Sequence, residues 1–499
     1  MILILKTKIL NQKMRTIISL LGSLLVVLGV MLLLPILVSL IYQEGIMSSF
    51  LTPALISLIG GLLTRFKFRE EKISISTGML VCALGWIVIS AIGAIPFYLE
   101  LDYSYLDTLF ETVSGFTTTG ITVFSGLGEF PRSILFWRSL IQWLGGLGFL
   151  TFFLVVTFRG QSGLFQLFTA ESHKINMSRP VPNIFKTIKI LWFIYAGFTV
   201  VEIILLKFLG LSSFDAVIHS LTTLSTGGFS SYDASIGYFK EAGYQYYQLI
   251  EYVIIFFMTV GGINFLVHYK VLTGSLEELW SGIEMKYFWG IIGGVSSLII
   301  FEHYLHFPFA WQNLEETFRT TLFQVVSVIT TTGYGTESIN GAFFPALAKQ
   351  LLLVLMLIGG CVGSTSGGIK VIRIAILNKL FSRELKKTYY PKSAVMPVVV
   401  EGNIIPDDEI FRMVALFFSW LALIVIGGGI TAILSDLPAW NAFSGIFSAL
   451  GNIGPFYFSV AKMQSLSPGI KITYIIAMLA GRLEILPIFV LFSPQAWRD

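Results

Sequence analysis

The stretch FTTTGITVF, residues Phe116–Phe124, carries four threonines around one glycine inside a strongly apolar sequence. Similar stretches follow at three later places, LSTGGFS (Leu224–Ser230), ITTTGYG (Ile329–Gly335) and, more loosely, LGNIGPF (Leu450–Phe456). Any one of them could be a connecting turn, since glycine and hydroxyl residues are common in turns. Four of them in one chain predict a repeated structural element instead.

The composition predicts an integral membrane protein. The chain has 499 residues, of which 55% are hydrophobic and 12% charged, and its mean hydropathy is +0.79. A soluble protein has about 25% charged residues, so this chain lacks the charge for a surface that faces water. Cys82 and Cys361 lie in apolar segments and indicate neither a disulfide framework nor a metal site. The net charge of +4 gives no reason to expect a nucleic-acid partner.

Ten apolar segments approach the roughly 20 residues that a membrane-spanning helix needs. They are 16–42, 48–64, 76–99, 134–158, 184–208, 245–269, 287–305, 345–378 (interrupted), 409–434 and 467–492. Four shorter apolar segments lie between them, at 106–117, 214–225, 319–330 and 440–451. Each short segment ends in one of the glycine-centred stretches. After residue 75 the order is therefore long segment, short segment, glycine-centred stretch, long segment, four times over.

The four copies can be aligned on Gly120, Gly228, Gly333 and Gly454. Thirteen positions earlier lie residues that often cap helix N-termini, Asp107, Asp215, Thr320 and Asn441. The later long segments align on QWLGGLGF, MTVGGINF, MLIGGCVG and MLAGRLEI, in which the second aligned position is Gly146, Gly262, Gly360 and Arg482. Agreement at both landmarks predicts a true fourfold repeat.

The expected fold is an all-α polytopic membrane protein. Two N-terminal transmembrane helices precede four helix–pore loop–helix repeats, which surround a pore in a pseudo-fourfold arrangement. The expected divisions are 1–72 for the N-terminal pair, 73–183, 184–286 and 287–392 for the first three repeats, and 393–499 for the fourth.

Lysine and arginine predict the orientation, because cytoplasmic loops carry an excess of both. They gather before the first repeat, between the first and second, and between the third and fourth: Arg65, Lys67, Arg69, Lys72; Arg159, Lys174, Arg179, Lys186, Lys189; Lys370, Arg373, Lys379, Arg383, Lys386, Lys387, Lys392. The glycine-centred stretches then enter from the external side. An even number of spans puts both termini in the cytoplasm.

Four short helices, each followed by a glycine-bearing extended stretch, predict an ion filter made of four re-entrant loops. Non-helical backbone at membrane depth is tolerated only inside protein or against water. Glycine allows torsions that aim carbonyls inward, and rings of carbonyl oxygens can replace the hydration shell of a monovalent cation. The partly negative C-terminus of each short helix also favours a cation. The expected filter residues are Thr118, Thr119, Gly120; Thr226, Gly227, Gly228; Thr331, Thr332, Gly333; Asn452, Ile453, Gly454.

Arg482 occupies, in the fourth copy, the position that is glycine in the other three. A charge within a membrane segment is a functional hypothesis by default. By the repeat symmetry it should face the pore below the filter, where a positive charge resists cation passage. The alternative is a structural ion pair, for which nearby Glu484 is the candidate partner.

The chain resembles the Trk/Ktr/HKT superfamily of potassium transporters, most closely its bacterial TrkH/TrkG membrane subunits. The resemblance covers nearly the whole chain and is carried by SGFTTTGITVF, FWRSLIQWLGGLGF, STGGFS, GGCVGSTSGGIKVIR and MLAGRLEILPIFVLFSPQAWR. In that family each repeat has a pore helix and a filter glycine. All four glycines are present here, as in the potassium-selective members. Two departures are Phe456 after Pro455, and Tyr334 with Gly335, which is closer to a potassium-channel signature.

The resemblance implies potassium uptake across a bacterial inner membrane, with K⁺ bound at Thr119, Gly227, Thr332 and Ile453. It also implies a homodimer with one pore per protomer and a cytosolic TrkA-like nucleotide-binding regulatory subunit. The basic loop 379–392 is a candidate contact for that subunit. K⁺ is the transported ion, and no organic cofactor is expected in this chain.

The resemblance further implies that the interruption GGCVGSTSGGIK (Gly359–Lys370) is a flexible gating loop beneath the filter. A helix runs poorly through so many glycines. Close packing of helices through small residues is the alternative. A phosphate-binding loop is disfavoured, because Lys370 does not directly follow a glycine and no strand precedes the stretch. The expected gate residues are Gly359, Gly360, Gly363, Ser364, Thr365, Ser366, Gly367, Gly368, Lys370 and Arg482.

Other functions remain as alternatives. A sodium-permeable or mixed monovalent cation transporter on the same fold is the nearest. An intramembrane enzyme would need convergent ionisable residues, and the sequence carries no catalytic triad, metal-ligand cluster or dinucleotide motif. A membrane scaffold would leave the fourfold glycine register unexplained. The sequence therefore predicts a transporter rather than an enzyme.

Overall fold

The computed structural model describes residues 2–68, 74–148, 184–391 and 395–497. The regular secondary structure of these residues is helical apart from two short strand pairs, β1 (Ile358–Gly359) with β2 (Ile369–Lys370), and β3 (Val398–Val400) with β4 (Asn403–Ile405). Six described helices are long and apolar enough to cross a membrane, and a seventh span results if one bent pair of helices counts as a single span. The prediction of a polytopic helical membrane protein is confirmed.

Some sequence predictions fall outside the described residues. The continuation of the predicted helix 134–158 beyond residue 148 is one of them. The others are basic residues that contributed to the predicted orientation, Arg69, Lys72, Arg159, Lys174, Arg179 and Lys392.

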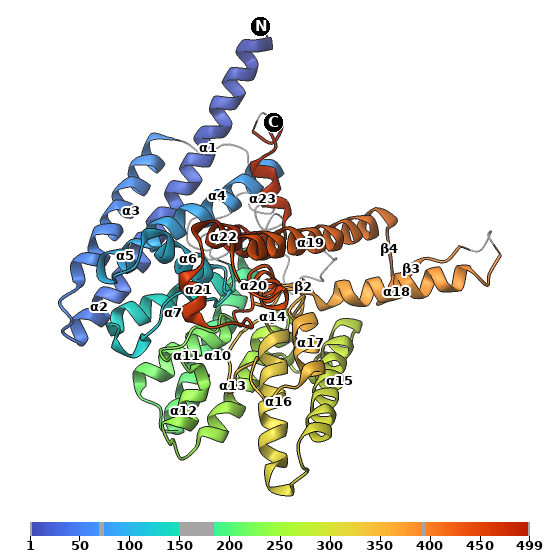
Figure 1. Ribbon diagram of the computed structural model, residues 1–499. Helices are drawn as coiled ribbons and strands as arrows, with labels where there is room; N and C mark the ends of the chain where they lie inside the picture. Colours follow the sequence, from blue (N-terminus) through green and yellow to red (C-terminus); the bar gives the residue numbers. More distant parts are fainter. Residues whose placement is uncertain (1, 69–73, 149–183, 392–394, 498–499) are drawn as a thin grey trace.

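The N-terminal segment forms α1 (Ile2–Met31), α2 (Leu33–Ile41) and α3 (Met47–Lys67). Pro35 lies in the first turn of α2 and lacks the N–H that would continue the hydrogen-bond ladder of α1. Figure 1 shows α1 and α3 side by side. They approach closely at Gly22 and Gly61, where a methyl group on Gly61 would lie 2.5 Å from the Gly22 carbonyl oxygen. Small residues commonly allow such close packing between membrane helices.

The remaining helices fall into three groups by length and by position along the chain. The first long helices are α4 (Ile75–Gly93) with α5 (Ile95–Glu100), α10 (Ile184–Phe208), α15 (Ile283–His306) and α19 (Asp407–Leu434). The short helices are α6 (Tyr105–Phe116), α11 (Ser213–Leu224), α16 (Leu314–Ile329) and α20 (Ala439–Gly451). The later helices are α7 (Arg132–Gly146), α13 (Tyr247–Gly262) with α14 (Phe265–Leu272), α17 (Ala346–Leu355) with α18 (Val371–Lys387), and α22 (Pro468–Arg482) with α23 (Leu486–Leu491). The connections contain η1 (Leu127–Glu129), η2 (Ser235–Gly237), α12 (Tyr238–Glu241), η3 (Leu276–Leu279), η4 (Trp311–Asn313) and α21 (Val460–Ser465).

The four predicted helix caps are wrong, and serines three positions earlier cap two of the short helices. Ser104 caps α6, and its hydroxyl accepts the N–H of Asp107 at 3.2 Å and donates to the Asp107 carboxylate at 2.7 Å. Ser212 and Asp215 repeat this arrangement on α11. The aspartates therefore lie three residues after the capping serines, inside the first turn of each helix. The two remaining predicted caps, Thr320 and Asn441, lie inside α16 and α20.

The later helices end close to the aligned glycines. Helices α7, α13 and α22 end at Gly146, Gly262 and Arg482. The predicted continuous helices 245–269 and 467–492 are therefore wrong. Helix α13 turns by 105° into α14, where the Asn264 side chain caps the new helix by accepting the Leu266 N–H at 2.9 Å.

Close packing against the short helices explains why glycine precedes each of these ends. A methyl group on Gly145 would overlap the Phe116 carbonyl oxygen, and one on Gly481 would overlap that of Leu450. A methyl group on Gly261 would lie 3.0 Å from the Leu224 carbonyl oxygen. All three carbonyls belong to the last turn of the short helix in the same repeat, so each pair of helices meets where the glycine-centred loop begins.

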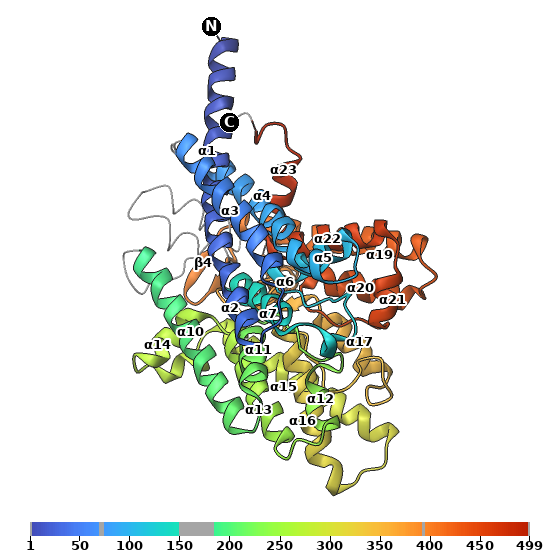
Figure 2. The ribbon, with the colours of Figure 1, turned by 90° about the vertical axis from the view of Figure 1, so that its left-hand side faces the viewer.

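Two apolar clusters hold these elements together. One joins α1–α4 mainly to the first and fourth repeats, and the other joins the second and third repeats. Figure 1 shows the same division, with the blue and red helices together and the green to orange helices together. Figures 1 and 2 both place the start of α1 and the end of α23 at the same end of the molecule.

We expect Gly145→Ala to destabilise the protein by about 1–3 kcal/mol, because the new methyl group overlaps backbone that cannot rotate away. Gly197→Ala in α10 is the matched control, since no atom lies within 4 Å of its new methyl group, and it should stabilise the helix by roughly 0.5–1 kcal/mol. Thermal unfolding of the detergent-solubilised protein measures both. Equal midpoints for the two variants would contradict the proposed close packing.

Candidate ion filter and gate

The four glycine-centred loops share one backbone conformation. Two residues in each loop have positive φ, and these residues are separated by one extended position. The first members are Thr118, Thr226, Thr331 and Asn452, with φ of 53°, 52°, 57° and 54°. The second members are Gly120, Gly228, Gly333 and Gly454, with φ of 78°, 73°, 83° and 108°. A left-handed conformation is uncommon for threonine, so its recurrence indicates a common local constraint.

Hydrogen bonds at the helix ends supply that constraint. Thr118 donates its N–H to the Gly115 carbonyl at 2.9 Å, and Thr119 donates to the Ser114 carbonyl at 2.8 Å. This pair of bonds is the Schellman motif, which ends a helix with a left-handed residue. The second bond recurs in the other loops, from Gly227 to Thr222 at 2.9 Å, from Thr332 to Ser327 at 2.9 Å and from Ile453 to Ser448 at 3.1 Å.

The four acceptor residues are a signal that the sequence analysis missed. Each lies six positions before the loop glycine, and each is a serine or threonine: Ser114, Thr222, Ser327 and Ser448. In the third and fourth loops the hydroxyl adds a bond of its own. Ser327 donates to the Tyr334 carbonyl at 2.7 Å, and the Ser448 hydroxyl accepts the Gly454 N–H at 3.0 Å.

The loops contact one another in a closed order. A methyl group on Gly120 would overlap the carbonyl oxygen of Gly227, and one on Gly228 would overlap that of Thr332. In the same way, one on Gly333 would overlap the carbonyl oxygen of Ile453. A methyl group on Gly454 would lie 3.0 Å from the carbonyl oxygen of Thr119. Each loop therefore touches the next, and the fourth returns to the first.

These contacts bring together the predicted filter residues and their carbonyl oxygens. Among the described residues, one of the four carbonyls accepts a hydrogen bond, that of Gly227 from the Gln142 amide at 2.6 Å. The described residues contain no group of three or more His, Cys, Asp or Glu side chains that could hold a metal ion. Backbone carbonyl oxygens are suited to a weakly held monovalent cation.

Three buried side chains on α6 and α7 hold the first two loops, namely Glu111, Arg138 and Gln142. Arg138 forms a buried ion pair with Glu111 at 2.7 Å and donates to the Ser230 carbonyl at 2.7 Å. Glu111 also accepts the Val123 N–H at 3.0 Å. Gln142 accepts the Phe229 N–H at 3.0 Å in addition to its bond to Gly227. The ion pair thus connects the loop of the first repeat to that of the second.

The glycine-rich stretch forms a loop that lies against the filter loops. Its ends are joined by the parallel pairing of β1 with β2. Thr365 donates its hydroxyl to the carbonyls of Leu224 and Gly261, both at 3.0 Å, and accepts from the Thr226 hydroxyl at 3.2 Å. Gly367 donates its N–H to the Thr331 hydroxyl at 2.8 Å. The loop is thus bonded to the second and third filter loops.

The rest of the predicted gate residues line or support this loop. Gly360 and Gly363 lie where the loop meets α13 and α14, since Cys361 donates to the Gly262 carbonyl at 2.9 Å and Phe265 donates to that of Gly363 at 3.1 Å. Lys370 donates to the carbonyls of Ser366 and Gly367. Gly359 is part of β1, Ser364 donates to the Cys361 carbonyl at 2.6 Å, and a methyl group on Gly368 would lie 2.7 Å from the Gly359 nitrogen.

Arg482 connects the glycine-rich loop Gly359–Lys370 to the first glycine-centred loop. Its guanidinium donates to the Thr365 carbonyl at 2.7 Å and to the Thr118 hydroxyl at 3.2 Å. It also donates to the carbonyls of Gly145 and Gly146, at 2.5 and 2.6 Å. Glu484, the partner considered for Arg482, forms an ion pair with Arg373 at 2.5 Å.

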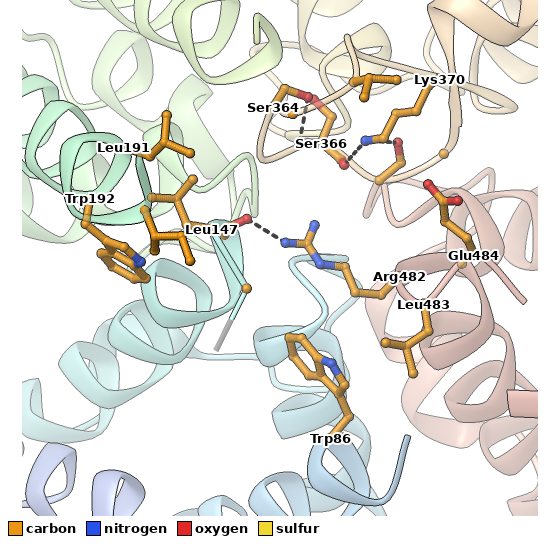
Figure 3. A pocket seen from close by; sticks show the side chains of 18 residues that line it. Trp86, Leu147, Leu191, Trp192, Ser364, Ser366, Lys370, Arg482, Leu483 and Glu484 are labelled. Carbon is orange, nitrogen blue, oxygen red and sulfur yellow. Dashed lines mark hydrogen bonds between the residues drawn. The ribbon is translucent and has the colours of Figure 1, made fainter. Parts of the chain in front are cut away.

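A cavity of about 170 Å³ adjoins the gate loop. Figure 3 shows Arg482 reaching into it from α22 toward the end of α7, with Lys370 and Ser366 on one side and Trp86 on the other. Arg482 therefore touches both the first glycine-centred loop and the cavity.

The sequence model of the TrkH family, described as cation transport protein, matches residues 45–286 and 302–498. The Trk system potassium uptake protein TrkH of Escherichia coli K12 is 36% identical over 495 residues, which cover 97% of this chain and 99% of the relative. An uncharacterized cation transporter of Methanocaldococcus jannaschii is 34% identical over 480 residues, with 96% and 95% coverage.

A solved structure agrees with these relatives. The crystal structure of the potassium transporter TrkH from Vibrio parahaemolyticus superposes with a TM-score of 0.83 at 31% identity, and the match covers 97% of this chain and 99% of that one. Family, relatives and fold coincide over nearly the full length. The chain belongs to the TrkH family of cation transport proteins.

Proposed function

We propose that this protein carries potassium into a bacterial cell across the inner membrane, through a selectivity filter formed by its four glycine-centred loops. The closed order of contacts between each loop glycine and a carbonyl oxygen of the next loop carries this proposal. The names of the relatives, potassium uptake protein and potassium transporter, support the choice of ion.

In this proposal the 2 + 4 arrangement predicted from the sequence builds the pore. The N-terminal pair is 1–72, and the pseudo-fourfold repeats are 73–183, 184–286, 287–392 and 393–499. The repeated pairs of left-handed residues support the repeats. The short helices direct their C-terminal, partly negative ends toward the ion.

The carbonyl oxygens of Thr119, Gly227, Thr332 and Ile453 bind K⁺ and replace part of its hydration shell. The bond from Gln142 to the Gly227 carbonyl is compatible with this role, because a carbonyl oxygen has two lone pairs. The Gly227 carbonyl oxygen still differs from the other three, because one of its lone pairs already accepts a hydrogen bond.

The gate consists of the loop Gly359–Lys370 and Arg482. The bonds from Thr365, Gly367 and Arg482 to three filter loops support this assignment. A fixed positive charge beside the pore raises the energy of a passing cation. A barrier of about 1.4 kcal/mol is enough to slow passage about tenfold.

The working assembly is a homodimer with a pore in each protomer and with both termini in the cytoplasm. A cytosolic TrkA-like nucleotide-binding subunit regulates it through the cytoplasmic segments, among them the basic segment 379–392. The prediction of a loop there is wrong as far as residue 387, because α18 (Val371–Lys387) continues to that residue. The start of α1 and the end of α23 lie at one end of the molecule, which supports placing both termini on the same side of the membrane.

The second candidate is a sodium-permeable or mixed monovalent cation transporter. The observation that favours it is the hydrogen bond from Gln142 to the Gly227 carbonyl, which makes this ligand unlike the other three. Paired rubidium and sodium uptake into proteoliposomes separates the two candidates, and growth rescue of an uptake-deficient bacterium at low potassium tests the first.

Gly120→Ser should lower the preference for potassium over sodium, because the new side chain meets the Gly227 carbonyl. Gly126→Ser is a close control. Gly126 has a similar φ of 72°, but no atom lies within 4 Å of its new side chain, so backbone strain is matched and filter crowding is not. The measurement is the rubidium-to-sodium uptake ratio per inserted protein. An unchanged ratio in the Gly120 variant would remove this glycine from the filter.

Arg482→Ala should raise basal potassium uptake per inserted protein, because it removes the charge and the bonds to Thr118 and Thr365, and Arg482→Lys should retain most of the restriction. Glu484→Gln is the control, since it breaks the ion pair with Arg373 and keeps the charge of Arg482. The structural alternative expects poor membrane insertion and lost uptake from Arg482→Ala. It would gain support if Glu484→Gln reproduced that loss.

A further inference from the structure

Tyr334 follows the filter glycine of the third loop, and its side chain is fully buried. Its hydroxyl forms a short hydrogen bond with the Thr222 hydroxyl and lies 3.2 Å from the carbonyl oxygen of His219. Both partners belong to α11, the short helix of the second repeat. The Tyr334 carbonyl is held by Ser327 of its own short helix at 2.7 Å. One residue thus connects the third loop to two short helices.

The partners of Tyr334 are the residues that hold the second filter loop. The Thr222 carbonyl accepts the N–H groups of Gly227 and Gly228, at 2.9 and 3.3 Å. The His219 ring lies 3.0 Å from the Ser230 hydroxyl, at the far end of the same loop. The Tyr334 hydroxyl therefore contacts the structure that fixes both ends of the second loop.

This link exists at one boundary of the four. The residue after the filter glycine is Ile121, Phe229 and Pro455 in the other loops, none of which has a hydroxyl group. The boundary between the first and second loops is held differently, by Gln142 and Arg138. The backbone contact between Gly228 and the Thr332 carbonyl gains its side-chain support from Tyr334.

We propose that Tyr334 is a specificity-determining positioning residue, which sets the spacing between the second and third filter loops without binding the ion. This inference rests on the proposed function, because it assumes that these loops form the filter. A loop that can shift toward its neighbour lets the carbonyl ring contract around a smaller cation. Loss of the hydroxyl therefore favours sodium relative to potassium.

Tyr334→Phe tests this directly, since it removes the hydroxyl and keeps the ring. We expect the rubidium-to-sodium uptake ratio to fall about fivefold, the factor that corresponds to one buried hydrogen bond, while rubidium uptake per inserted protein stays near wild type. Tyr457→Phe is the matched control. Tyr457 is equally buried, and its hydroxyl donates to the Lys349 carbonyl on α17, away from the helix ends that hold the filter loops.

Thr222→Val provides the second arm, because it removes the partner hydroxyl and leaves the backbone acceptor of Gly227 in place. It should lower the ratio in the same direction, and the double variant should fall less than the two single effects combined, as expected for residues in contact. If Tyr334→Phe inserts poorly, Thr222→Val still carries the test.

Two results overturn the inference. One is an unchanged ratio in Tyr334→Phe and Thr222→Val, and the other is an equal fall in Tyr457→Phe. Wild-type protein and Gly120→Ser distinguish this failure from failure of the proposed function. If wild-type protein prefers rubidium and Gly120→Ser loses that preference, the filter stands and the role of Tyr334 alone is rejected. Wild-type protein without potassium uptake would reject the proposed function itself.

Discussion

The approach of each loop glycine to a carbonyl oxygen of the next loop is the constraint on which the rest of the structure depends. Three of these contacts leave no room for a methyl group, and the fourth leaves 3.0 Å. The glycines take positive φ, and the residue two positions earlier does the same because it ends a short helix. Each short helix, the left-handed residue that ends it and the glycine two positions later thus form one structural unit, which occurs four times.

The residues that end the short helices also hold the proposed gate. The Thr118, Thr226 and Thr331 hydroxyls bond to Arg482, Thr365 and Gly367. In the fourth repeat, a methyl group on Gly367 would lie 2.6 Å from the Asn452 β-carbon. None of these contacts involves the four close approaches between a loop glycine and a carbonyl oxygen of the next loop. In the proposed function, the loop Gly359–Lys370 opens by breaking these side-chain bonds, while the four glycine-centred loops keep their backbone contacts with one another.

Features that recur along the sequence could be predicted from it. Periodic glycines located the loops, the short helices and the aligned position of Arg482, since each recurs at a similar spacing. The bend after Gly262 and the ion pair of Glu484 with Arg373 escaped prediction. The bend depends on the fit of two helices, and the ion pair joins residues from different repeats, so neither leaves a local pattern. The serine caps could have been predicted, because serine is a preferred N-cap residue and Ser104 and Ser212 stand just before the two short helices.

The four loops share one backbone conformation, but different side chains support each boundary between neighbouring loops. A single chain can vary these side chains independently, whereas four identical subunits would have to repeat them. Arg138 and Gln142 support the boundary between the first and second loops, and Tyr334 supports the next one. At the boundary between the fourth and first loops, the Asn452 amide donates to the Thr119 hydroxyl at 2.8 Å. The support at each of these three boundaries uses side chains that the other two do not share. Substitutions of the loop glycines therefore change the backbone contacts between loops, whereas substitutions of the supporting side chains act first on one boundary between two loops.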